Sequence, residues 1–197
     1  MIEIHPQKIK GNWTEGYALD FHTVSSDYIG DDEFGRPKFE TKRTDMGELL
    51  YRLKYKSDKS VLKIIINTAS AFIESHNFSA DLIIPVPPSR ERRQFQPVLT
   101  LAKGIGTNLE IAECSGCIIK IKHTPELKNI YAFKERLELL TDAYAVNKPE
   151  VSGKKVLLFD DLFRSGATLH AITKALFEKG NAERVDVVTL TRTRRKS

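Results

Sequence analysis

The residues best suited to chemistry lie together in one short stretch near the end of the chain. Two adjacent carboxylates, Asp160 and Asp161, follow an apolar run, and Ser165, Gly166 and Thr168 come soon after them. Hydroxyl groups, a glycine and the unpaired N–H groups at the start of a helix form phosphate cradles in proteins. An acidic pair repels phosphate and suits hydroxyl groups or hydrated Mg²⁺ instead. This combination therefore predicts a site for a phosphorylated sugar such as ribose 5-phosphate.

Two common nucleotide-binding patterns and a purely structural role fit this stretch less well. Neither the phosphate-loop pattern G-x-x-x-x-G-K-[ST] nor the dinucleotide pattern G-x-G-x-x-G occurs anywhere in the chain. A structural role, in which the acids form a turn and cap a helix, needs only one carboxylate or hydroxyl group. It accounts for neither the second acid nor the S-G-x-T sequence, so a ligand site is the better interpretation.

Apolar segments of two different periodicities must position this stretch. Short apolar runs predict strands over residues 81–86, 117–122, 155–159 and 185–190. Apolar side chains at helical spacing predict helices over residues 47–56, 59–75, 98–108 and 167–179. Their alternation predicts an α/β fold, a parallel Rossmann-like sheet with helices on both sides. Ligands in such a sheet bind beyond the carboxyl ends of the strands, so the loops after Val86 and Phe159 should lie side by side.

The N-terminal fifth of the chain has a different pattern. Four apolar residues alternate with smaller or polar ones and predict a strand: Trp13, Tyr17, Leu19 and Phe21. Residues 30–35 predict a turn, and residues 38–41 predict a returning strand. We therefore expect residues 1–45 to form a hairpin or small hood, and residues 46–197 to form the core domain.

Composition limits the class of protein. Of 197 residues, 41% are hydrophobic and 29% are charged, which is a globular composition rather than a disordered one. The longest apolar runs have three or four residues, whereas a membrane span needs about 18, so no membrane partner is expected. The N-terminus lacks the features of a signal peptide, and a cytoplasmic location is expected. The net charge of +5 suits an anionic ligand without requiring nucleic acid, and the basic C-terminal residues are interpreted as a solvated tail.

The chain has two cysteines, Cys114 and Cys117, in a C-x-x-C arrangement. Such a pair can form half of a zinc site or a redox pair. A closed zinc site needs about four ligands, and no second C-x-x-C or matching histidine pair occurs in the chain. We therefore expect two ordinary buried thiols near the start of a strand, in a reducing compartment.

At residues 160–168, the signature D-D-x-x-x-S-G-x-T resembles the phosphoribosyl-pyrophosphate-binding motif of the type I phosphoribosyltransferases. Residues 81–193 are similar to the ComF-like branch of that family, whose founding members are competence-associated. The strand ending in Pro85-Val86-Pro87 matches the branch, and residues 93–96 stand where it usually has R-G-F-N. The four-cysteine zinc module that often precedes this branch has no counterpart, because the N-terminal region has no cysteine.

The resemblance implies a type I phosphoribosyltransferase fold and a role for each motif residue. Asp160 and Asp161 would hold the ribose hydroxyls and, through the substrate, Mg²⁺. The 5-phosphate would be wrapped by five consecutive residues: Arg164, Ser165, Gly166, Ala167 and Thr168. Ser89 and Arg90 would bind pyrophosphate. The polar stretch 123–142 would be a lid that brings cationic side chains to the pyrophosphate: Lys122, Lys128 and Arg136.

The implied activity is transfer of ribose 5-phosphate from phosphoribosyl pyrophosphate to an unidentified nitrogen acceptor, with Mg²⁺ and release of pyrophosphate. An alternative is a regulatory protein that binds phosphoribosyl pyrophosphate or a nucleotide without turnover, or an accessory of DNA uptake. The implied partners are phosphoribosyl pyrophosphate, a small nitrogenous acceptor and a second copy of the chain in a homodimer. Nucleic acid is not expected as a partner.

Overall fold

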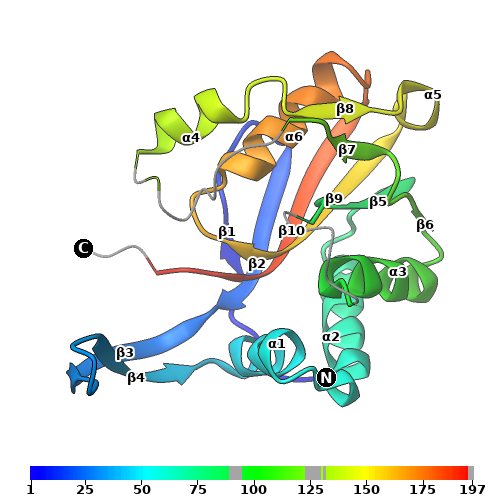
Figure 1. Cartoon of the computed structure of the whole chain (residues 1–197). Coiled ribbons are helices and arrows are strands. Elements are labelled where there is room, and N and C mark those ends of the chain that lie inside the picture. The colour runs from blue at the N-terminus through cyan, green and yellow to red at the C-terminus, as the bar shows by residue number, and fades with distance from the viewer. Residues whose placement is uncertain (89–94, 123–129, 131, 195–197) are drawn as a thin grey trace.

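A six-stranded sheet forms the centre of the protein, for which a computed structural model describes residues 1–88, 95–122, 130 and 132–194. Its strands lie in the order β1 (Gln7–Lys8), β2 (Glu15–Phe21), β10 (Arg184–Arg192), β9 (Lys155–Phe163), β5 (Leu82–Pro85) and β6 (Ala112–Glu113). Every neighbouring pair is parallel except β1 with β2 (Figure 1). The predicted parallel α/β sheet is confirmed.

Helices cover both faces of this sheet. One face carries α1 (Asp45–Tyr55), α2 (Leu62–Ser75), preceded by the 3₁₀ turn Lys59–Val61, and α3 (Pro97–Leu109). The other face carries α6 (Ala167–Glu178) and a two-stranded sheet, β7 (Ile118–Lys120) with β8 (Tyr144–Val146). The short helices α4 (Phe133–Leu139) and α5 (Lys148–Val151) complete the described elements. The four predicted helices are confirmed, and among the described residues none of the helices has the length and apolar character needed to cross a bilayer.

Successive side chains of the central strands enter opposite cores. On β9, Leu158 packs in the core on the α6 side, whereas Leu157 and Phe159 pack with α1, α2 and α3. Side chains alternate along a strand, so Asp160 continues the row that faces α6, and Asp161 continues the row that faces α1. The two neighbouring carboxylates therefore leave β9 on different sides of the sheet.

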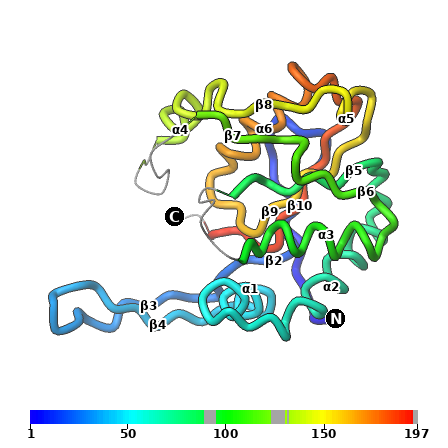
Figure 2. Tube along the Cα trace, turned by 45° about the vertical axis from the view of Figure 1, so that its right-hand side comes forward, coloured from blue at the N-terminus to red at the C-terminus, as the bar shows by residue number. Residues whose placement is uncertain are grey.

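The N-terminal segment divides between the sheet and a protruding arm. β2 belongs to the sheet because Ala18 and Leu19 are fully buried in its two opposite cores. The predicted turn is therefore flanked not by β2 but by β3 (Thr23–Asp31) and β4 (Pro37–Arg43), which extend away from the body (Figure 2). The hairpin is confirmed, with a first strand that lies later in the sequence than expected. The division of the chain at residue 45 stays a prediction.

The two cysteines are bonded to each other, so the expectation of two ordinary thiols is wrong. Cys114 and Cys117 form a disulfide with Cα atoms 5.4 Å apart. The chain reverses between β6 and β7, and the N–H of Cys117 donates to the carbonyl of Cys114 at 3.3 Å. This turn brings the two side chains within the range of a disulfide. The spacing of the cysteines does not reveal the turn, which is why sequence analysis missed the bond.

Candidate functional site

The strand β9 carries the acidic pair to the carboxyl edge of the sheet. The apolar run predicts a strand end at Phe159, but β9 continues to Phe163 because its pairing with β10 persists to that residue. Asp160 and Asp161 are consequently strand residues, and their backbones are fixed by the sheet rather than by a loop. Only three residues, Arg164–Gly166 in sequence, then connect β9 to α6.

The loop after β5 begins at the same edge, as predicted. The N–H of Val86 donates to the carbonyl of Phe159 at 2.8 Å, which fixes the end of β5 beside β9. Ser89 and Arg90, the predicted pyrophosphate ligands, lie outside the described residues, and so does Lys128. Their roles stay predictions.

Gly166 makes the short connection from β9 to α6 feasible. It is the N-cap of α6 and has φ 78°, in the left-handed region that side chains disfavour. A Cβ at this position would lie 2.7 Å from the ring of Phe163. Gly166 has no side chain to cap α6, and Ser165 Oγ lies 3.5 Å from the N–H of Ala167. The first turn of α6 therefore offers backbone donors to an anion.

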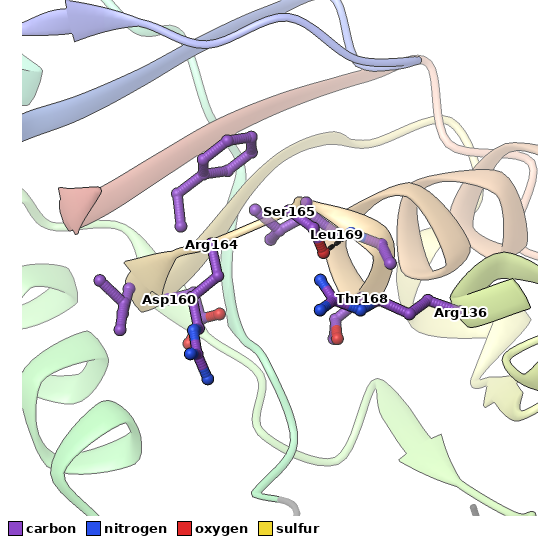
Figure 3. Close-up of a pocket in the computed structure, with 10 residues that line it drawn as sticks. Arg136, Asp160, Arg164, Ser165, Thr168 and Leu169 are labelled. Carbon is purple, nitrogen blue, oxygen red and sulfur yellow. Dashed lines mark hydrogen bonds between the residues drawn. The ribbon is translucent and has the colours of Figure 1, made fainter. Parts of the chain in front are cut away.

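A cavity of about 120 Å³ lies at this helix N-terminus (Figure 3). It is lined by Arg136, Asp160, Leu162, Phe163, Arg164, Ser165, Gly166, Ala167, Thr168 and Leu169. Seven of the predicted residues therefore share one cavity: Asp160, the five residues of the predicted phosphate loop, and Arg136 of the predicted lid. Asp161, which the same motif contains, does not line it.

The lining of the cavity combines cationic groups, hydroxyl groups and one carboxylate. Arg136 reaches it from α4, and its Nε donates to the carbonyl of Ile130 at 2.6 Å. Figure 3 shows the Arg136 side chain directed toward Thr168 and the Arg164 side chain beside Asp160. Guanidinium groups and a helix N-terminus attract phosphate, whereas the carboxylate accepts hydrogen bonds from hydroxyl groups. The arrangement suits a phosphorylated polyol.

Burial changes the protonation of Asp160. The carboxyl group is withdrawn from solvent and lies beside the charge of Asp161, and both effects raise the pKa of Asp160. The N–H of Asp161, which donates to Asp160 Oδ1 at 2.8 Å, and the Lys54 ammonium group partly oppose this rise in pKa. The cavity therefore presents a carboxyl group that holds its proton to a higher pH than an exposed aspartate does.

Asp161 has a different partner on the opposite side of β9. Its Oδ2 lies 2.7 Å from Nζ of Lys54 on α1, and the two side chains are only 13% and 20% exposed, respectively. Sequence analysis missed Lys54. A signal was present, because Lys54 follows Leu50 by four residues and so falls on the apolar face predicted for this helix. A lysine on a buried face requires a partner of opposite charge.

Thr168 connects the phosphate loop to β8. The Tyr144 hydroxyl, which is buried and lies near Asp160, has a pKa raised to about 12 by burial first and by that charge second. A hydrogen bond with the Thr168 side chain works in the opposite direction on this pKa. Thr168 therefore has a hydroxyl at the cavity and a structural partner behind it.

Removing the Thr168 hydroxyl should weaken phosphate binding. We expect Thr168→Val to weaken binding of phosphoribosyl pyrophosphate by about 1–3 kcal/mol, the usual cost of losing a hydrogen bond to a charged group. Thr168→Ser keeps the hydroxyl and should bind nearly as well as the wild type. Isothermal titration calorimetry measures both. Equal affinity of the valine variant would mean that the main chain alone holds the phosphate.

Comparison with known proteins identifies the domain that contains this cavity. Residues 120–197 match the family model described as phosphoribosyl transferase domain. The competence protein ComFC of Bacillus subtilis is 28% identical over 153 residues, which are 75% of this chain and 60% of the relative. The competence protein F of Haemophilus influenzae is 27% identical over 145 residues, 68% of this chain and 63% of the relative. The chain thus spans about three fifths of the length of these curated relatives.

Solved structures agree on the fold. An adenine phosphoribosyltransferase from Trypanosoma brucei, in complex with AMP, pyrophosphate and ribose 5-phosphate, has a TM-score of 0.52 at 13% identity, covering 95% of this chain and 74% of that one. The glutamine phosphoribosylpyrophosphate amidotransferase of Bacillus subtilis has a TM-score of 0.51 at 18% identity, covering 81% and 34%. Residues 120–197 thus match a phosphoribosyl transferase domain, the chain is similar to the ComF-type competence proteins, and its fold is that of the type I phosphoribosyltransferases.

Proposed function

We propose that the chain transfers ribose 5-phosphate from phosphoribosyl pyrophosphate to a nitrogen acceptor and releases pyrophosphate. The observation that carries the proposal is the cavity at the N-terminus of α6, which joins Asp160 to the loop of residues 164–168. A phosphate-binding loop next to a carboxyl group matches a sugar that carries both a phosphate ester and free hydroxyl groups. The family to which the domain belongs supports the same substrate class.

The proposed step breaks the bond between C1 of the ribose and the pyrophosphate oxygen, which leaves with the electron pair. The lone pair of the acceptor nitrogen forms the new bond to C1, and the nitrogen then loses its proton to solvent or a base. Residues 164–168 would hold the 5-phosphate, and Asp160 would accept a hydrogen bond from the ribose hydroxyls. Arg136, which lines the same cavity as Thr168, would add positive charge beside the 5-phosphate.

The proposal includes a Mg²⁺ ion that binds together with the substrate. Within residues 1–88, 95–122, 130 and 132–194, no group of three or more His, Cys, Asp or Glu side chains could hold a metal ion. Mg²⁺ is commonly held by one or two carboxylates together with substrate phosphates, and Asp160 with the hydroxyls of Ser165 and Thr168 provides such oxygen donors. Bound in this way, Mg²⁺ would supply positive charge to the pyrophosphate.

The proposal predicts acceptor-dependent release of pyrophosphate. A panel of purine, pyrimidine and pyridine bases and simple amines, each with phosphoribosyl pyrophosphate and Mg²⁺, should include at least one acceptor that produces pyrophosphate above the rate of hydrolysis. An enzyme-coupled pyrophosphate assay measures the release, and mass spectrometry identifies the ribosylated product. Tight binding of phosphoribosyl pyrophosphate without release for any acceptor would contradict the proposed transfer.

That contrary result would favour the second candidate function, a protein that binds phosphoribosyl pyrophosphate or a nucleotide without turnover. The observation behind this candidate is that both curated relatives are competence proteins. A role as an accessory of DNA uptake further predicts affinity for DNA that falls steeply with salt. Arg192 and Arg194 would contribute to it, and double alanine substitution should then reduce the salt dependence.

The remaining expectations about partners and location stay proposals. A homodimer is testable by analytical ultracentrifugation. Five large apolar side chains exposed on the arm are the first positions to examine for self-association: Val24, Tyr28, Ile29, Phe34 and Phe39. A cytoplasmic location is testable by fractionation of cells.

A further inference from the structure

An ion pair on the far side of β9 joins the candidate site to α1. Asp161 Oδ2 and Lys54 Nζ are 2.7 Å apart, and both side chains are mostly buried. The backbone carbonyl of Asp161 also accepts a hydrogen bond from Oγ1 of Thr191 on β10, at 3.3 Å. Asp161 is therefore held by its side chain and by its main chain, and neither contact comes from the cavity.

The position of α1 is itself fixed, which makes this pairing specific. The side chain of Thr44 caps α1 by accepting from the N–H of Gly47 at 3.1 Å, and it donates to the carbonyl of Phe21 at 2.6 Å. A Cβ on Gly47 would lie 2.0 Å from the carbonyl oxygen of His22, so only glycine allows the helix to approach β2 this closely. α1 thus begins against the end of β2 and directs Lys54, two turns later, to Asp161.

The surroundings of Lys54 favour its charged form. Burial disfavours the charge of Lys54, but the charge and the hydrogen bond of Asp161, with a smaller contribution from Asp160, raise the pKa of Lys54 overall. Tyr55 also acts on the pKa of Lys54, and His22 and Arg43 lie near the pair; burial followed by the charges of Arg43 and Lys54 lowers the pKa of His22. Asp161 is therefore neutralised by a lysine that keeps its proton.

We propose that Lys54 is a positioning residue of the site: it binds Asp161 on the α1 side of β9 and cancels its charge, so that Asp160 is the one carboxyl group among the described residues that faces the phosphorylated ligand. The inference rests on the proposed function, because the ligand is phosphoribosyl pyrophosphate. Without Lys54, an uncompensated carboxylate would lie next to a site for a highly anionic molecule. Repulsion through a partly buried region is weakly screened and should weaken binding.

Substitutions that change one charge at a time test the inference. Lys54→Met should weaken binding of phosphoribosyl pyrophosphate by about tenfold, because it leaves the partly buried charge of Asp161 without its partner. Lys54→Arg keeps the charge and should bind within about twofold of the wild type. Lys56→Met removes an exposed lysine at the end of the same helix and serves as the matched control. Calorimetry gives each dissociation constant, and circular dichroism confirms that each variant is folded.

The decisive measurement is the double variant Lys54→Met with Asp161→Asn. It leaves no unpaired charge, so it should fold even where Lys54→Met alone does not, and it should recover binding to within about threefold of the wild type. A merely structural ion pair would instead lower the Tm of Lys54→Met while leaving the dissociation constant of the folded variant at the wild-type value. Asp161→Asn alone should also bind nearly as well as the wild type.

Three results would overturn the inference while leaving the proposed function intact: full affinity of Lys54→Met, no recovery in the double variant, or loss of binding in Asp161→Asn. The last result would mean that Asp161 contacts the ligand directly, as the family resemblance implies. A wild-type protein that binds no phosphoribosyl pyrophosphate would instead overturn the proposed function, and the inference with it.

Discussion

Gly166→Ala should weaken binding of phosphoribosyl pyrophosphate by at least about tenfold, because the substitution acts on the backbone that forms the phosphate cradle. Gly166 has φ 78°, and an added Cβ would lie 2.7 Å from the ring of Phe163. Relief of that contact requires Phe163 or the first turn of α6 to move. Both line the cavity, so either movement changes the geometry of the donors around the 5-phosphate.

The chain contains a matched control for this substitution. Gly153 has φ 72°, but a Cβ there would meet no atom within 4 Å. Gly153→Ala therefore imposes a similar backbone strain in open space, away from the cavity. Both variants should lose some stability against thermal unfolding, and only Gly166→Ala should lose affinity in calorimetry. Equal affinity of the two variants would show that the cavity at α6 is not the phosphate site.

The part of the site that sequence predicts well is the part that is contiguous. Residues 160–168 contain their own strand end, turn and helix start, so local preferences are enough to bring Asp160 and Thr168 to one cavity. The parallel sheet can also be predicted from the sequence, because its central strands are apolar on both faces. Local pattern also predicts four helices, because each has a sustained apolar periodicity: residues 47–56, 59–75, 98–108 and 167–179.

The features that sequence does not predict depend on contacts between distant segments. The extension of β9 past Phe159 follows from its pairing with β10. The mixed polar and apolar sequence of residues 160–163 does not predict that pairing. The partner of Asp161 lies 107 residues away, on a helix whose position depends on the close approach at Gly47. The disulfide depends on a turn between two very short strands. In each case the deciding interaction is tertiary, and no local pattern encodes it.

The two acids of the motif occupy different positions in the structure. In the sequence they are equivalent neighbours, and the resemblance assigns both to the ribose hydroxyls. Strand geometry separates them, because consecutive side chains on β9 enter opposite sides of the sheet. Asp160 lines the cavity and has a raised pKa, whereas Asp161 is paired with Lys54. Substitutions at the two positions should therefore have different consequences for function.

At a pH above the raised pKa of Asp160, where the carboxylate is ionised, Asp160→Asn should lower kcat/KM for phosphoribosyl pyrophosphate by about 10- to 100-fold, since a hydrogen bond to a charged acceptor contributes about 1.5–3 kcal/mol. The amide keeps the shape of the side chain and can still accept from the N–H of Asp161, so the local fold should persist. A steady-state assay of pyrophosphate release measures the effect on kcat/KM. Calorimetry without an acceptor measures the dissociation constant of phosphoribosyl pyrophosphate. Asp142→Asn, at an exposed position paired with Lys179, is the control that should change neither.

The same substitution should stabilise the protein at high pH. Burial and the neighbouring Asp161 raise the pKa of Asp160 above its value in the unfolded chain, so the folded state holds its proton more tightly. Stability from this group is present below the unfolded pKa and is lost as the pH rises through the folded pKa. Asparagine cannot ionise, so it removes the loss: we expect a gain on the order of 1 kcal/mol, roughly 2–4 °C in Tm, above the folded pKa and none in acid. A variant that is inactive and yet more stable at alkaline pH would identify Asp160 as a group kept at a cost in stability for the sake of the site, whereas a lower Tm at every pH would mean that its carboxylate supports the fold.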